Sequence, residues 1–192
     1  MSASSYGIIV EGPYDSAFYE AVIQRLSPHA CVSARVCDGK SNLTRKFPAL
    51  LKTFEHELAG RPLEMAIVIR DADGKNPEEI EAQMRSKIAN RDYPFGLGVK
   101  FFAVPQAMES WLLADVNALN AVSQRRNGKR VTKSHEAPES LRNPKGWFRE
   151  FLTNQNVVYT AEVAREIAEE LDLNTLSVRC PRFRVFSELV DC

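Results

Sequence analysis

Acidic side chains follow two of the most apolar runs in the sequence, and their types and spacing are those of a metal site. Glu11 comes directly after the run at residues 7–10, and Asp71 and Asp73 follow the run at residues 65–69. If these runs are neighbouring strands of a parallel sheet, their carboxyl ends share one edge and the three carboxylates converge. Converging carboxylates repel one another unless a cation joins them, and hard oxygen ligands favour Mg²⁺, Mn²⁺ or Ca²⁺. The set therefore predicts phosphoryl transfer or phosphodiester hydrolysis assisted by a divalent cation.

The spacing of the two aspartates adds to this prediction. On an extended segment, residues two apart point the same way, so Asp71 and Asp73 are expected on one side of the strand. A single acid at the end of a strand is commonly a turn or capping residue. The Asp-x-Asp-Gly sequence after one run, combined with Glu11 after another, is more specific than any of these acids alone.

Several other sites do not match the sequence. A calcium-binding EF-hand loop would need an acid or Asn at Lys75, a glycine at Asn76 and a glutamate at Ala82. The G-x-x-x-x-G-K-[ST] phosphate-binding loop and the G-x-S-x-G elbow of serine hydrolases are both absent from the sequence. In haloacid-dehalogenase-type phosphatases the Asp-x-Asp continues with Gly-Thr on the first strand, whereas here Lys75 follows Gly74 on the third.

The segments that must position these acids alternate between strand and helix patterns. Continuous apolar runs are typical of buried parallel strands, and a helical spacing of apolar residues follows each run. The second helix is expected to begin at Ser41 or Asn42, or nearer Pro48, and the fourth to run from Ala107 to about Val122. The alternation predicts an α/β fold with a mainly parallel four-stranded sheet flanked by helices. The expected strands are residues 7–10, 31–37, 65–69 and 99–104.

The overall composition is that of an ordinary globular domain. The chain has 192 residues, with 25 basic and 25 acidic residues, so its formal net charge is zero. This balance excludes a generally basic nucleic-acid coat and an acidic disordered tail. No apolar stretch approaches the roughly 18 residues of a membrane span. The first six residues lack the pattern of a secretory signal, and the four cysteines lack C-x-x-C spacing, so we expect a cytoplasmic protein with reduced thiols and no membrane association.

The zero net charge hides two opposed blocks. Residues 124–149 hold eight bases and two acids, a net charge of +6, and residues 150–174 hold six acids and one base, a net charge of −5. This change predicts a metal-binding domain at residues 1–123 and a mostly helical extension with a basic loop at residues 124–192. The basic block could bind the phosphate backbone of DNA or RNA, or could simply offset the acidic helix after it. The candidate nucleic-acid-binding residues are Arg125, Arg126, Lys129, Arg130 and Lys133, with Trp147 and Phe148 as candidates for stacking on bases.

These motifs resemble those of TOPRIM domains, the metal-binding fold of topoisomerases, bacterial primases and OLD-type nucleases. The matching pieces are Glu-Gly-x-x-Asp at residues 11–15 and Asp-Ala-Asp-Gly at residues 71–74. More closely, the chain resembles a family of compact TOPRIM-like bacterial proteins. That resemblance adds Ala-Val-Pro at residues 103–105, Glu-Ser-Trp-Leu-Leu-Ala-Asp at residues 109–115 and Cys-Pro-Arg-Phe-Arg at residues 180–184. It implies a TOPRIM-like, Rossmann-like sheet.

The resemblance also implies a role for each acid. Glu11 would be a general base or metal ligand, Asp71 and Asp73 metal ligands, and Glu109 a further acid at the same edge. The implied activity is a Mg²⁺- or Mn²⁺-dependent nuclease that cleaves DNA or RNA. Related compact proteins are often encoded beside an ABC-type ATPase in phage-defence loci, so such an ATPase is an implied partner. Three other residues are not expected to take part in the chemistry. We expect Lys40 to be solvated, Trp111 to lie in the core and Asp115 to have a structural role.

Two alternatives to a nuclease stay open at this point. One is a non-catalytic TOPRIM-like module that binds a partner ATPase and keeps the acids for folding or metal binding. The other is a phosphatase that acts on a small molecule.

Overall fold

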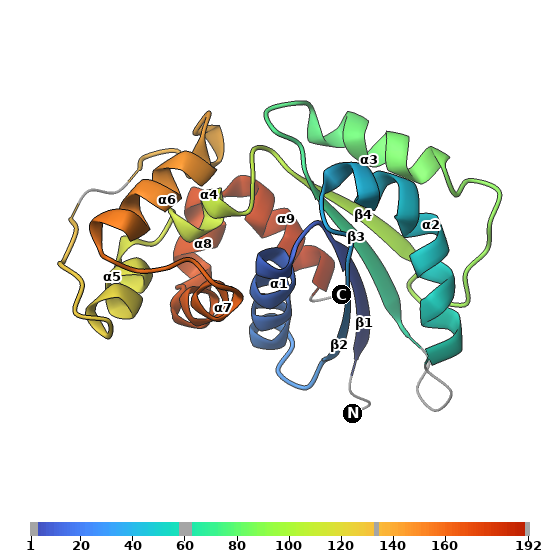
Figure 1. The fold of residues 1–192 in the computed structure, drawn as a ribbon. Coiled ribbons are helices and arrows are strands. Elements are labelled where there is room, and N and C mark those ends of the chain that lie inside the picture. Colours follow the sequence, from blue (N-terminus) through green and yellow to red (C-terminus); the bar gives the residue numbers. More distant parts are fainter. Residues whose placement is uncertain (1–3, 58–62, 133–134, 191–192) are drawn as a thin grey trace.

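A parallel sheet lies at the centre of the molecule. The computed structural model describes residues 4–57, 63–132 and 135–190. These residues form a four-stranded sheet in which every paired strand is parallel, in the order β2-β1-β3-β4 (Figure 1). Strands β1 and β3 are neighbours, as the convergence of their acids requires, and the predicted α/β class is confirmed. The strands are β1 (Ser5–Val10), β2 (Cys31–Val36), β3 (Met65–Asp71) and β4 (Val99–Val104).

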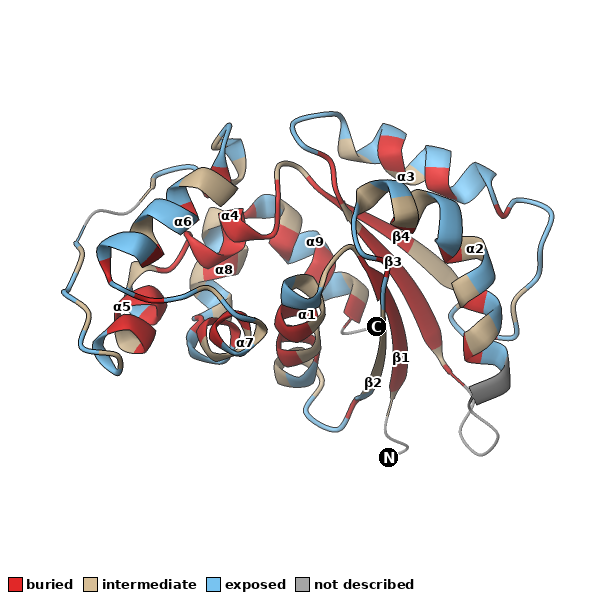
Figure 2. Ribbon diagram, in the orientation of Figure 1, coloured by how far each residue is buried: buried red, intermediate tan, exposed pale blue. Residues whose placement is uncertain are grey.

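Both faces of the sheet are buried, which explains why its central strands are continuous apolar runs. Successive side chains of a strand point to opposite faces. Ile8 and Ile67 therefore belong to one buried cluster, while Ile9 and Val68 belong to another on the opposite face. Helices α2 (Lys40–Glu57) and α3 (Pro77–Ser86) cover the second face, and α1 (Pro13–Leu26) and the C-terminal helices cover the first (Figures 1 and 2).

The C-terminal region shares a core with the sheet. The buried cluster on the α1 face continues through the later helices to Val190. Trp111 lies fully buried at the junction, with its ring centroid 5.1 Å from that of Phe183 on the last helix. The Tyr6 hydroxyl of β1 donates to the Val190 carbonyl at 2.8 Å. The later helices are α4 (Glu109–Leu112), α5 (Val116–Gln124), α6 (Pro144–Asn154), α7 (Ala161–Glu170), α8 (Leu173–Arg179) and α9 (Pro181–Val190), with a short 3₁₀ helix at Pro138–Ser140.

Two helices differ from the sequence prediction. Helix α2 begins at Lys40 and continues through Pro48. A proline cannot donate to the carbonyl four residues before it, and that carbonyl, of Thr44, instead accepts from Lys87 Nζ at 3.0 Å. The single helix expected from residue 107 to about residue 122 is wrong, because α4 ends at Leu112. Asp115 then starts α5 by accepting the backbone N–H groups of Asn117 and Ala118, so it is a structural residue as predicted.

In the part of the chain that the structure describes, none of the helices is both long and apolar enough to cross a membrane.

Candidate active site

The adjacency of β1 and β3 joins the first two predicted site residues. Glu11 follows the last residue of β1, and Asp71 is the last residue of β3. The Asp71 backbone N–H donates to Glu11 Oε1 at 3.2 Å. Burial raises the pKa of the Glu11 carboxyl, and repulsion from Asp71 raises it further. The two residues therefore meet at the carboxyl edge of the sheet, where open α/β sheets bind their ligands.

Asp71 is the most enclosed acid of this group, with 5% of its surface exposed. Its Oδ1 accepts the Met108 N–H at 3.2 Å, and its Oδ2 accepts from Lys145 Nζ at 2.6 Å. Burial raises the pKa of Asp71, although the Lys145 ammonium opposes this shift. For Lys145, burial works to lower the pKa, but the attraction of Asp71 outweighs it and the pKa is raised. The pair is thus a charged contact whose carboxylate is buried.

Lys145 reaches this acid because of how α6 begins. Asn143 caps the helix through its Oδ1, which accepts the Gly146 N–H at 3.0 Å, and Pro144 occupies the first turn. The next residue, Lys145, lies in the first turn of α6, and its side chain contacts Asp71 at the carboxyl end of β3. Sequence reasoning counted Lys145 only as part of the basic block. Its capped position after Asn143-Pro144 was visible in the sequence, but its contact with Asp71 depends on the tertiary fold.

Strand β3 ends at Asp71, so Asp73 does not lie on the strand. The chain leaves the strand here: Asp73 has a φ of 49° and Gly74 a φ of 78°, both in the left-handed region. The expectation that both aspartates lie on one extended segment is therefore wrong. The Asp73 side chain is largely exposed and forms an ion pair with Lys40, at the start of α2. Lys40, expected to be solvated, is thus in contact with a predicted metal ligand.

Two further acids complete the cluster. Glu109, predicted as an assisting acid, is the first residue of α4 and is buried, and burial raises its pKa. Asp15, in the first turn of α1, was not among the predicted site residues. Burial, together with repulsion from Asp71, Glu109 and Glu11, raises the pKa of Asp15 to about 8. The Glu-Gly-x-x-Asp spacing was the available signal, since a helix that begins at Pro13 holds Asp15 close to Glu11.

Two buried tyrosine hydroxyls are acted on by the charge of these acids. Tyr19 is 1% exposed. Among the described residues, neither its hydroxyl nor the buried hydroxyl of Tyr159 has a hydrogen-bond partner. Burial raises the pKa of both hydroxyls, and the nearby carboxylates, including Asp71 for Tyr19 and Glu109 for Tyr159, raise it further. A buried hydroxyl without a partner costs free energy, so these groups point to a site that something else completes.

Two ammonium groups contact the acids of this cluster, which holds more carboxylates than ammonium groups. Across residues 4–57, 63–132 and 135–190, no three Asp, Glu, His or Cys side chains are grouped as a ready set of metal ligands. Lys145 pairs with Asp71, and Lys40 pairs with Asp73. Even so, Asp71, Glu109 and Glu11 all act electrostatically on Lys145, and two buried tyrosine hydroxyls lack partners. An excess of oxygen ligands and unpaired hydroxyls suits a cation that keeps part of its water shell.

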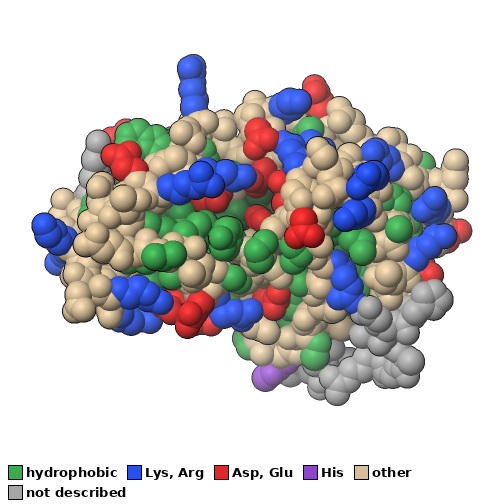
Figure 3. Space-filling model, in the orientation of Figure 1, with side chains coloured by type: hydrophobic (Ala, Val, Ile, Leu, Met, Phe, Trp, Pro, Cys, Tyr) green, Lys and Arg blue, Asp and Glu red, His purple; other side chains and the backbone are tan. Residues whose placement is uncertain are grey.

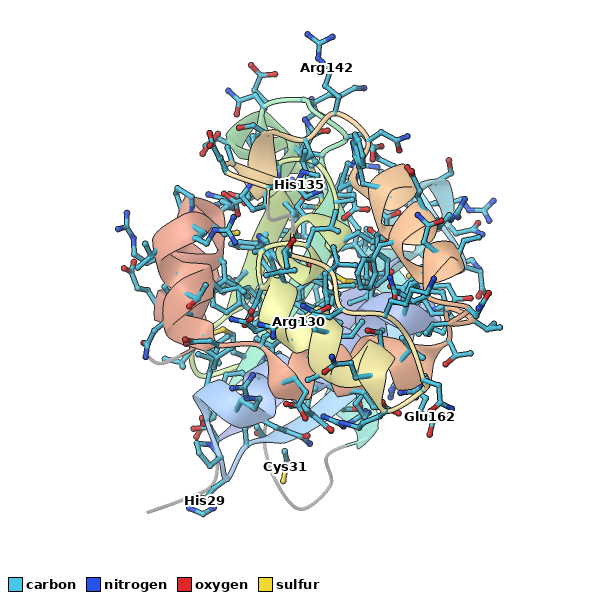
Figure 4. All side chains as sticks on the ribbon, turned by 90° about the vertical axis from the view of Figure 1, so that its left-hand side faces the viewer. His29, Cys31, Arg130, His135, Arg142 and Glu162 are labelled. Atoms are coloured by element: carbon cyan, nitrogen blue, oxygen red, sulfur yellow. The ribbon has the colours of Figure 1, made fainter. Side chains whose placement is uncertain are left out.

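The predicted nucleic-acid residues lie elsewhere. Arg125 pairs with Glu170, and Arg126 forms a two-pronged contact with Glu166 at 2.6 and 2.5 Å, so the basic block partly neutralises α7. Lys129 and Arg130 are exposed, and Lys133 lies outside the described residues. Figure 4 views the helical end of the molecule, where Arg130 lies on the segment after α5. Figure 3 shows acidic side chains gathered between the sheet and the helical region, with basic side chains on either side.

The two candidates for stacking on bases, Trp147 and Phe148, differ in exposure. Phe148 is fully buried and contacts Tyr159 edge-on, so it is a core residue. Trp147 is 44% exposed and contacts His135. Trp111 is fully buried, as predicted.

Comparison with known proteins places the chain in a family. Residues 10–190 match a family model described as "Domain of unknown function (DUF4276)". No significant match was found among curated proteins or among solved structures. The matched region includes Glu11, Asp15, Asp71, Glu109 and Lys145, and it runs through both the sheet and the C-terminal helices. Because the model covers nearly the whole chain, the protein belongs to the DUF4276 family.

Proposed function

We propose that the protein is a Mg²⁺- or Mn²⁺-dependent nuclease, which cleaves phosphodiester bonds at the carboxyl edge of β1 and β3. The observation that carries the proposal is the contact of Asp71 with Glu11 across these neighbouring strands, inside a partly buried group of acids. Glu11 and Asp71 would hold the cation, and Asp73 would join them once released from Lys40. When bound, the cation supplies stabilisation of the charge that develops on the phosphoryl group.

The chain's own residues have separate tasks in this proposal. Lys145 has 44% of its side chain exposed, so its ammonium can contact a phosphate oxygen while it stays beside Asp71. Asp15, with a pKa of about 8, holds a proton at neutral pH and can hydrogen-bond the leaving oxygen. Glu11, whose pKa is also raised, would be the group that accepts a proton from an attacking water if it does not itself hold the cation.

The test is cleavage of single-stranded and duplex DNA and RNA, with Mg²⁺, with Mn²⁺ and with a chelator. We expect cleavage that needs the cation and falls at least 100-fold in Asp71→Asn, because loss of one positioned charge typically costs about that much or more. Asp92→Asn, which changes an exposed aspartate in the loop before β4, is the matched control and should cleave normally.

Binding of the cation is measured separately, by titration of Mg²⁺ followed by calorimetry or thermal melting. Wild-type chain that cleaves no strand with either metal, and that binds no Mg²⁺ through Asp71, would overturn the proposal. Equal cleavage by wild type and Asp71→Asn would also overturn it.

A further inference from the structure

A stacked pair of tyrosines lies at the rim of the acid cluster. The rings of Tyr14 and Tyr159 have centroids 4.4 Å apart and planes 25° apart. Tyr14 keeps 39% of its surface exposed, and Val158, the neighbour of Tyr159, is 77% exposed. An exposed aromatic ring that is supported on one face still offers flat apolar surface to a second planar group.

The tyrosine pair packs on the buried core through Tyr159. The Tyr159 ring contacts Phe148 edge-on, with centroids 4.9 Å apart and planes 79° apart, and Phe148 is fully buried in α6. The Tyr159 hydroxyl is itself buried. Tyr14 therefore rests on a ring that is anchored in the core, and little conformational freedom remains to be lost when a ligand stacks on it.

The tyrosine pair is close in sequence to two of the acids. Tyr14 lies in the first turn of α1, directly before Asp15 and three residues after Glu11. Glu109 and Asp15 act on the Tyr159 hydroxyl strongly enough to raise its pKa, after the larger effect of burial. A strand with a phosphate at the acid cluster would thus bring the base of an adjacent nucleotide to the Tyr14 ring.

We propose that Tyr14, supported by Tyr159, stacks on an unpaired base of the substrate, which makes this a site for single-stranded nucleic acid. The inference rests on the proposed nuclease function and names its substrate class. A base inside a duplex already stacks on both faces and is not available to the tyrosine, whereas a base in a single strand has a free face and gains from the contact. Stacking accepts any base, so the site would be selective for unpaired strands and tolerant of sequence.

The experiment measures the affinity of a fluorescent single-stranded phosphorothioate oligonucleotide, which resists cleavage, with Mg²⁺ and with Asp71 intact, so that the proposed cation site is kept; the parent is the wild-type chain. Tyr14→Ala should weaken binding about 5- to 100-fold, the loss expected for one stacked base. Tyr14→Trp should bind at least as well as the parent, because the ring is kept. Tyr93→Ala is the matched control: Tyr93 also stacks on an aromatic ring, that of Phe95, but it precedes β4 and so lies toward the opposite edge of the sheet.

A second probe tests the base directly. An oligonucleotide in which one nucleotide at a time is abasic should bind the parent more weakly at one position, and Tyr14→Ala should show no further loss at that position. Affinity of Tyr14→Ala equal to that of the parent, or duplex bound as tightly as single strand, would overturn the stacking proposal.

The two proposals fail in different ways. If wild type cleaves duplex and single strands equally and Tyr14→Ala does the same, the stacking proposal fails while the nuclease stands. If no nucleic acid is cleaved with any metal, the nuclease fails, and with it the substrate class inferred from it.

Discussion

Lys145 Nζ lies 2.6 Å from Asp71 Oδ2, across 74 residues of chain, and it joins the helical region to the carboxyl edge of the sheet. The acid is buried and the lysine is partly open to solvent. A cation that binds Asp71 must therefore share this carboxylate with the ammonium group or displace it.

Replacing Lys145 with methionine should change how the protein responds to Mg²⁺. Without the metal, Lys145→Met leaves the buried Asp71 carboxyl short of one partner, so we expect stability to fall by about 1–3 kcal/mol. The rise in melting temperature on adding Mg²⁺ should then exceed that of wild type, because the metal no longer competes with the ammonium. Lys129→Met, at an exposed position, is the control. A rise with Mg²⁺ equal to that of wild type would contradict the competition.

Asp15 should make the metal-free protein less stable at alkaline pH. Its folded-state pKa of about 8 lies above the ordinary value of 3.8, so the folded protein keeps a proton that the unfolded chain has lost. The stabilisation is complete below about pH 4 and is lost as pH rises through 8. Asp15→Asn keeps a neutral group at every pH.

We therefore expect thermal melts of wild type to fall between pH 6 and 9 more steeply than those of Asp15→Asn. The difference should reach about 1 kcal/mol or more, since each pKa unit corresponds to about 1.4 kcal/mol. Asp92→Asn should follow wild type. Parallel curves for wild type and Asp15→Asn would show that the Asp15 pKa is not raised.

A side chain at Gly74, in the turn after β3, should be unfavourable. Its φ of 78° is unfavourable for other residues, and an added Cβ would lie 3.2 Å from the Gln106 amide nitrogen. Gly74→Ala should therefore lower stability by about 1–2 kcal/mol, measured by urea denaturation. Gly96 has open space around it and no positive φ, so Gly96→Ala should cost less. Equal losses in both variants would contradict a strained turn.

Arg126 should act mainly on stability. Its two-pronged contact with Glu166 lowers the pKa of that acid, chiefly through the hydrogen bond. Arg126→Ala is expected to cost about 0.5–1 kcal/mol, whereas Lys129→Ala should cost almost nothing. In a salt titration of oligonucleotide binding, a larger loss of affinity for Lys129→Ala than for Arg126→Ala would support the exposed residues as the phosphate contacts. The reverse order would mean that Arg126 leaves Glu166 to bind the strand.

The fold was readable from the sequence because the central strands are buried on both faces, and their apolar runs end in acids at one edge. The neighbouring positions of Glu11 and Asp71 follow from that pattern once β1 and β3 pair. Lys145 could not be assigned, because its partner lies 74 residues away and only the packing of α6 brings them together. The direction of the Asp73 side chain depends on a left-handed turn. The following glycine is compatible with such a turn, but it does not by itself predict one. The pairing of Arg126 with α7 likewise needs the tertiary structure.

The hydrogen bond from Tyr6 to the Val190 carbonyl has a consequence for the order in which the protein can be made. These residues are 184 positions apart, and the core on the α1 face includes side chains from both ends of the chain. A chain that ends after β4 lacks α9, so Tyr6 stays uncovered until residues 181–190 have been added. Contacts so distant in sequence form slowly. The acid cluster needs α4 and α6 on this same core, so a fragment that stops after β4 would not carry it.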